Sequence, residues 1–151
     1  MADTSYLKRE VEQYVREQLA TEFGVPFRPK VLTLDTGGTH EFDAVSADGV
    51  VVAAIKAASG LTSGGKNPSG KIKTAIAELY YLSLVSAPVR LLILTNPEFH
   101  ALLSRDVVGR LAPGLALKLV PLPTEMAKRV RQIQDEASRE VSGPGRGTRA
   151  L

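Results

Sequence analysis

Residues 39–56 read THEFDAVSADGVVVAAIK, and this stretch predicts a β-hairpin. Asp48-Gly49 is a strong turn signal, because a tight two-residue turn needs backbone that tolerates a positive φ. The following residues, 50–58, are almost continuously apolar, which is typical of a strand covered on both faces of a sheet. Lys56 interrupts that apolar run. The hairpin is therefore expected to lie inside a layered domain and to carry one unusual charged side chain.

The segments around the hairpin predict an α/β fold. Residues 4–23 carry apolar side chains at three- and four-residue spacings, which is the stripe of an amphipathic helix. The other expected elements are strands at 31–35, 39–47 and 50–58, a helix at 71–86, a strand at 90–95, a helix at 97–111, a strand at 115–120 and a helix beginning at 124. A strand, a helix and another strand in succession favour a parallel pair. The order αβββαβαβα thus predicts a mixed central β-sheet flanked by helices.

The length and composition fit one domain of ordinary size. The chain has 151 residues, and domains cluster near ~100–150 residues. We expect the domain to span residues 1–142 and the Gly/Arg-rich residues 143–151 to be disordered. The absence of cysteine excludes disulfides, thiolate zinc sites and cysteine nucleophiles. The formal charge of +3 permits nucleic-acid binding without requiring it.

Two patterns bear on the compartment. No apolar run approaches the ~18 residues that a membrane span requires, so no membrane partner is expected. The first residues lack the basic stretch and apolar core of a secretory signal. The cytoplasm is therefore the expected location.

Asp43 and the tripeptide Ala54-Ile55-Lys56 resemble a nuclease motif. In the PD-(D/E)xK superfamily of nucleases and their restriction-enzyme relatives, an acid on the second strand and an (Asp/Glu)-x-Lys on the third strand converge at a sheet edge. The resemblance covers residues 6–95 in element order. It implies a restriction-endonuclease-like fold and a DNA endonuclease that hydrolyses phosphodiester bonds with Mg²⁺ or Mn²⁺. Carboxylates would hold the cation, and the lysine would stabilise developing charge.

The resemblance assigns roles residue by residue. Asp43 corresponds to the acid of the second strand, Lys56 to the lysine and Ala54 to the acid of the third strand. Side chains two positions apart on a strand point to the same face, so Ala54 stands where a metal ligand is expected. The family also has an acid on its first helix. Glu12 is favoured over Glu10 for that role, because it borders the apolar stripe.

Three explanations of Ala54 fit the sequence. The acid has migrated to the following helix, as in some restriction enzymes, and Glu78 is then the third metal ligand beside Asp43 and Glu12. Alternatively, the alanine is an engineered substitution, since Ala54→Glu would complete the motif. The third explanation is a natural loss of catalysis. The chain would then be an inactive member of the fold that binds nucleic acid or a partner protein.

Residues 59–70 are rich in Gly and Ser and are expected to form a loop after the third strand. Its first part nearly matches the phosphate-binding pattern G-x-x-x-x-G-K-[ST], but Asn67 replaces the Ser/Thr and Pro68 disturbs the helix start. Hydroxyls, lysines and backbone N–H groups are the usual contacts to a nucleic-acid backbone. The expected DNA-binding residues are Ser59, Thr62, Ser63, Lys66, Lys71 and Lys73. An ordinary surface loop is the alternative.

The last expected helix has an apolar stripe formed by Met126, Val130, Ile133 and Ala137. Such a stripe is compatible with two arrangements, because it packs either into the core of its own chain or against a second copy. A homodimer is therefore one of the expected partners. Dimerisation would also suit the cleavage of both DNA strands.

Overall fold

The computed structural model describes residues 5–58 and 69–142. The helices of these residues are η1, a π-helical turn (Leu7–Val11), α1 (Glu12–Phe23), α2 (Ser69–Ser83), α3 (Pro97–Val107) and α4 (Thr124–Ser142). The strands are β1 (Phe27–Thr33), β2 (Thr39–Ser46), β3 (Val51–Lys56), β4 (Val89–Leu94) and β5 (Leu115–Leu119). The expected disordered tail, residues 143–151, lies outside the described residues.

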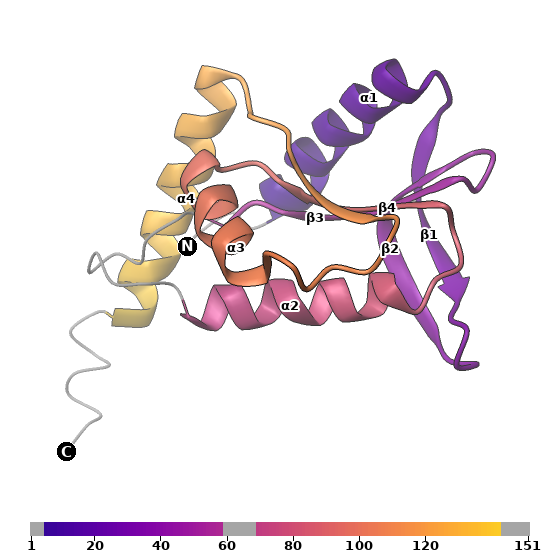
Figure 1. The fold of residues 1–151 in the computed structure, drawn as a ribbon. Helices are drawn as coiled ribbons and strands as arrows, with labels where there is room; N and C mark the ends of the chain where they lie inside the picture. Colours follow the sequence, from indigo (N-terminus) through magenta and orange to yellow (C-terminus); the bar gives the residue numbers. More distant parts are fainter. Residues whose placement is uncertain (1–4, 59–68, 143–151) are drawn as a thin grey trace.

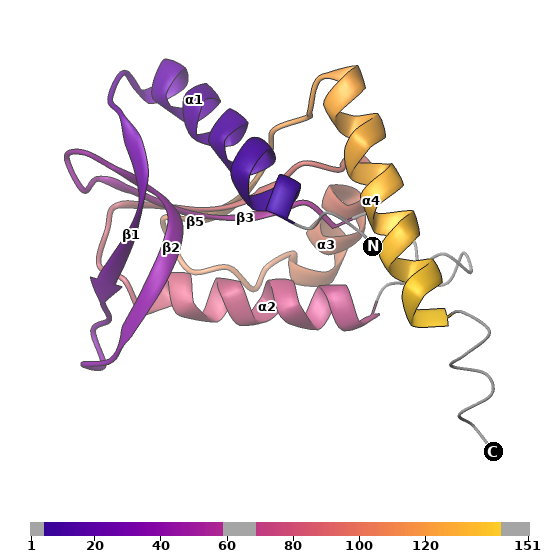
Figure 2. The ribbon, with the colours of Figure 1, turned by 180° about the vertical axis from the view of Figure 1, so that it is seen from behind.

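The strands form one mixed sheet in the order β1-β2-β3-β4-β5. The pairs β1/β2 and β2/β3 are antiparallel, whereas β3/β4 and β4/β5 are parallel. Figures 1 and 2 show α1 and α2 on opposite faces of this sheet, with α4 beyond the end of β3. The prediction of an α/β fold with a mixed sheet flanked by helices is confirmed. Among the helices described, none combines the length and apolar character needed to cross a membrane.

Each face of the sheet has its own apolar core. The side chains of β3 alternate between the two faces, because successive residues of a strand point in opposite directions. Val52 and Ala54 belong to the cluster that includes residues of α2 and α3, and Ala53 and Ile55 belong to the cluster that includes Val15 and Leu19 of α1. This alternation explains the continuous apolar run of β3, since both of its faces are covered.

The first strand begins earlier than the sequence pattern predicts. Residues 31–35 were the expected strand, but β1 spans Phe27–Thr33. Its side chains are mostly exposed, and β1 is an edge strand. An exposed edge strand needs no apolar alternation, so residues such as Arg28 and Lys30 are compatible with it and carry no strand signal.

A β-bulge lies in β2, the strand that carries Asp43. The register between β1 and β2 shifts between Arg28 and Lys30, so that Pro29 lies opposite both Asp43 and Ala44. Proline has no N–H to donate, and it is tolerated in a sheet at edge strands and bulges. A bulge locally disrupts the ladder and re-aims side chains. The backbone around Asp43 is therefore displaced from regular strand geometry.

The hairpin between β2 and β3 is held by side-chain hydrogen bonds. The Ser46 hydroxyl donates to Asp48 Oδ1 at 2.7 Å and accepts from the Val51 N–H at 2.9 Å. Asp48 Oδ1 also accepts from the Val50 N–H at 3.1 Å, and Gly49 has a φ of 75°. These bonds keep the pKa of Asp48 below its ordinary value, the one from Ser46 most of all. The expected turn at Asp48-Gly49 is confirmed.

Candidate functional site

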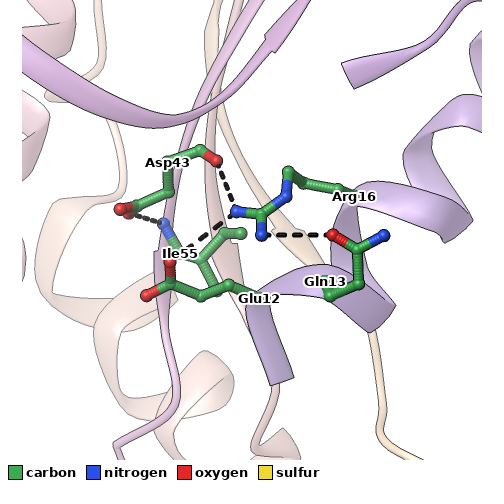
Figure 3. Close-up of polar contacts among 5 residues, drawn as sticks. All are labelled: Glu12, Gln13, Arg16, Asp43 and Ile55. Atoms are coloured by element: carbon green, nitrogen blue, oxygen red, sulfur yellow. Dashed lines mark hydrogen bonds and ion pairs between the residues drawn. The ribbon is translucent and has the colours of Figure 1, made fainter. Parts of the chain in front are cut away.

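Asp43 lies where β2 and β3 separate. The pairs of this ladder are Val45 with Val52 and Ala44 with Ala53, and the ladder does not continue to Asp43. Instead, the Asp43 carboxylate accepts a hydrogen bond from the Ile55 N–H, with an N–O distance of 2.8 Å (Figure 3). The side chain thus replaces a backbone acceptor that the bulged strand no longer supplies.

Glu12 and Arg16 reach this point from α1. Arg16 Nη1 donates to the backbone carbonyl of Asp43 at 3.0 Å and lies 3.7 Å from Glu12 Oε1, while Nη2 donates to Gln13 at 3.3 Å (Figure 3). The side chains of Arg16 and Glu12 are only 13% and 19% exposed. Glu12 is therefore beside Asp43, as expected from the apolar stripe. Its carboxylate is paired with the guanidinium of Arg16.

Arg16 was not anticipated from the sequence. Its only signal is the spacing to Glu12, since residues four apart on a helix are neighbours. Such pairs are common on solvated helix surfaces, and the sequence does not reveal that this one faces β2. The Arg16 guanidinium makes the site less favourable for a metal ion, because it neutralises the Glu12 carboxylate that would otherwise be available as a ligand.

Ala54 is part of the apolar core. It is 1% exposed and clusters with Val52, Leu92 and Ala75 of α2. Glu12 lies on the opposite side of the sheet, because α1 contributes to the other apolar cluster. An acid at position 54 would therefore extend from β3 toward α2.

Lys56 ends β3 and is half-buried. Alternation along the strand places it on the same face as Ala54, as expected. Its backbone carbonyl accepts from the Thr95 N–H at 3.3 Å. Within residues 5–58 and 69–142, the Lys56 ammonium has neither a hydrogen bond nor an ion pair. Asp43 instead has the Ile55 N–H as its partner.

Glu78 contacts β2 at His40 and not at Asp43. Its Oε2 lies 3.5 Å from His40 Nε2, and the His40 ring stacks on Tyr81 at 4.0 Å with an interplanar angle of 6°. His40 also meets the edge of Phe42 at 4.8 Å. Glu78 thus helps to hold α2 against β2. In the described ranges, no group of three His, Cys, Asp or Glu side chains is placed to hold one metal ion.

The expected DNA-binding residues fall into two groups. Ser59, Thr62, Ser63 and Lys66 lie outside the described residues. Lys71 and Lys73 lie in the first two turns of α2, the element that follows β3 along the chain. Lys73 is exposed, and Lys71 is half-buried, where burial lowers the pKa of its ammonium.

Comparison with family models, with curated proteins and with solved structures found no match to this chain. The function is therefore inferred from the geometry of the site.

Proposed function

We propose that this chain is a nucleic-acid-binding module of restriction-endonuclease-like fold that does not hydrolyse its ligand. The observation that carries the proposal is the burial of Ala54 in an apolar cluster, where the motif of an active nuclease has an acid. The two remaining acids are already engaged. Asp43 accepts from a backbone N–H, and Glu12 is paired with Arg16.

Positive charge supports binding to a phosphate backbone. Lys56 ends β3, and Lys71 and Lys73 lie in the first two turns of α2. The N-terminus of a helix also carries partial positive charge from its unpaired N–H groups. Lysines and helix N-termini are the groups that hold phosphates in protein–DNA complexes. The proposed interface consists of the three lysines Lys56, Lys71 and Lys73.

The salt dependence of DNA binding tests this proposal. A protein that neutralises phosphates releases counterions, so log K falls linearly with log salt, by about 0.9 for each contact on duplex DNA. Fluorescence anisotropy of a labelled duplex should show such a slope for the unmodified protein. The double variant Lys56→Gln/Lys73→Gln should bind more weakly at every salt concentration and with a shallower slope.

Arg105→Gln is the matched control, because Arg105 is an exposed cation in the last turn of α3. It removes one charge away from the proposed interface and should leave the slope unchanged. If the control weakened binding as much as a single lysine change, the attraction would follow net charge and not this interface. No DNA affinity at low salt would leave a protein-interaction role.

A metal-dependent DNA endonuclease is the second candidate. It is favoured by one observation: the Arg16 guanidinium contacts both the Glu12 carboxylate and the backbone carbonyl of Asp43, so the two acidic residues meet at one side chain. If Arg16 released Glu12 and the Asp43 carboxylate left the Ile55 N–H, these two carboxylates would supply oxygen ligands of the kind that Mg²⁺ or Mn²⁺ prefers. The candidate requires Mg²⁺- or Mn²⁺-dependent cleavage that Asp43→Ala abolishes. Binding without cleavage in both ions would exclude it.

A further inference from the structure

A cavity lies at the carboxyl ends of the parallel strands, and Asp43 is not among its lining residues. It has a volume of about 370 Å³ and is lined by residues that follow β3, β4 and β5 and by the first turns of α4. Ligands of open α/β sheets bind in the crevice outside the carboxyl ends of the strands. The volume lies at the lower end of the ~300–1,000 Å³ of small-molecule sites. Its size fits a small ligand.

Thr95 lines this cavity, and the described residues offer its hydroxyl no hydrogen-bond partner. The residue is 5% exposed, and its N–H already bonds to the carbonyl of Lys56. Its neighbour Leu94 belongs to the apolar cluster that includes α2, so alternation directs the Thr95 side chain to the opposite face, toward the cavity. In the described part of the chain, its hydroxyl makes no hydrogen bond. This hydroxyl can therefore donate to or accept from a ligand in the cavity.

The charges around the cavity favour an anion. Lys128 and Arg131 line it from α4, one helical turn apart. Lys128 is 3.7 Å from Glu125, but both side chains are exposed, at 69% and 89%, so the pair is weak. Arg131 has no ion pair within residues 5–58 and 69–142. At least one cation is thus free to meet a ligand.

The start of α3 forms another wall. Asn96 caps this helix by accepting from the Phe99 N–H at 2.9 Å, and Pro97 follows it. The positive end of the helix dipole therefore faces the cavity that Asn96 and Pro97 line. Opposite it, Gln134 Nε2 donates to the carbonyl of Ala57 at 2.7 Å, which fixes α4 to the end of β3. The cavity is bounded on two sides by anchored elements.

We propose that this cavity binds a small phosphate-bearing anion. Arg131 and Lys128 would supply charge, and the Thr95 hydroxyl would donate a hydrogen bond to a phosphoryl oxygen. Charge-assisted bonds from Arg to phosphate are among the stronger hydrogen bonds in proteins. This site shares no residue with the proposed nucleic-acid interface and does not depend on it.

Titration of the full chain with inorganic phosphate and, separately, with AMP tests the proposal by calorimetry. Arg131→Gln should weaken binding about tenfold or more, because it removes a charge-assisted bond. Thr95→Val, which keeps the side-chain shape, should weaken phosphate binding about fivefold. Thr95→Ser, which keeps the hydroxyl, should bind as the unmodified protein does. Arg105→Gln, an exposed charge on α3, should bind as the unmodified protein does.

The two probes distinguish the source of the phosphate group. Tighter binding of AMP supports a nucleotide ligand, and equal or tighter binding of inorganic phosphate supports a free anion. The proposal is overturned if neither probe binds at millimolar concentration, or if Arg131→Gln and Arg105→Gln have the same effect. Because Arg131 is exposed, its change tests the site even if Thr95→Val fails to fold. If the unmodified protein bound neither phosphate nor AMP but still bound DNA through Lys56, this site would be refuted and the proposed function would not.

Discussion

Asp43 has a structural role, the acceptance of a backbone hydrogen bond, that does not depend on any catalysis. Its carboxylate is the acceptor for the Ile55 N–H at a point where β2 has left the ladder. A buried N–H without an acceptor costs free energy, so this contact stabilises the separation of the two strands. Loss of activity in an Asp43 variant is therefore not sufficient evidence of a catalytic role, and stability must be measured as well.

Asp43→Ala should lower the free energy of unfolding by about 1–2 kcal/mol, because it leaves the Ile55 N–H without its acceptor. Asp43→Asn should cost less, since its amide oxygen can still accept that bond. Urea unfolding followed by circular dichroism measures both. If Asp43→Ala were as stable as the unmodified protein, the hydrogen bond to Ile55 would have no structural importance.

Ala54→Glu separates the explanations of the altered motif. Ala54 is 1% exposed in an apolar cluster, so a carboxylate there should destabilise the protein by about 2–4 kcal/mol and gain no cleavage. Ala47→Glu, at an exposed hairpin position, is the control and should be nearly neutral. A stable Ala54→Glu protein that cleaves DNA with Mg²⁺ would show instead that the alanine replaces a functional acid.

At the scale of elements, the hairpin between β2 and β3 is stabilised by hydrogen bonds to the ionised Asp48 carboxylate, and this stabilisation depends on pH. The pKa of Asp48 lies below its ordinary value of 3.8 because the Ser46 hydroxyl and the Val50 N–H bond to its ionised form. A carboxyl group with a lowered folded-state pKa stabilises the fold above its unfolded pKa and loses that effect as the pH falls through the folded one. Asp48→Asn should therefore be less stable than the unmodified protein at pH 6.

That difference in stability should shrink as the pH falls below 3.8 and through the lower, folded-state pKa. Urea midpoints of both proteins between pH 6 and pH 2.5 measure it. Glu41→Gln, an exposed change on β2, serves as the control for general charge effects. If the difference in urea midpoint between the two proteins did not change with pH, ionised Asp48 would not stabilise the turn.

The elements that were predictable from sequence are those with strong periodicity. The apolar run of β3 and the Asp48-Gly49 turn are local signals, and both correspond to observed elements. The start of β1 was misplaced, because an edge strand facing solvent has no apolar pattern to read. The bulge of β2 opposite Pro29 and the inward position of Arg16 depend on contacts between distant residues, which no single stretch of sequence encodes.

At the scale of the whole molecule, α4 uses its apolar stripe inside its own chain. Val130 is 6% exposed and Ile133 is 1% exposed, so these positions are covered without a second copy. Gln134 and Arg129 add contacts to Ala57 and to the ring of Tyr6. A homodimer through this stripe would require α4 to leave these contacts, which argues that α4 belongs to the fold.

Ile133→Ala should accordingly lower the free energy of unfolding by about 2–5 kcal/mol, as expected for a fully buried aliphatic side chain. The truncation of the protein after residue 123 should be more disruptive still. Val108→Ala, at a side chain that is 75% exposed, is the matched control. If Ile133→Ala changed only the oligomeric mass in light scattering and left stability intact, the stripe would be a dimer face.

The fate of a labelled DNA duplex incubated with the protein and Mg²⁺ is decisive for the proposed function. Anisotropy on the sample before quenching and a denaturing gel afterwards report binding and cleavage together. We expect a bound duplex that stays intact, and a lower bound fraction for Lys56→Gln/Lys73→Gln. Cleavage that requires Mg²⁺ and is abolished by Asp43→Asn, in a variant that remains folded, would contradict the proposal.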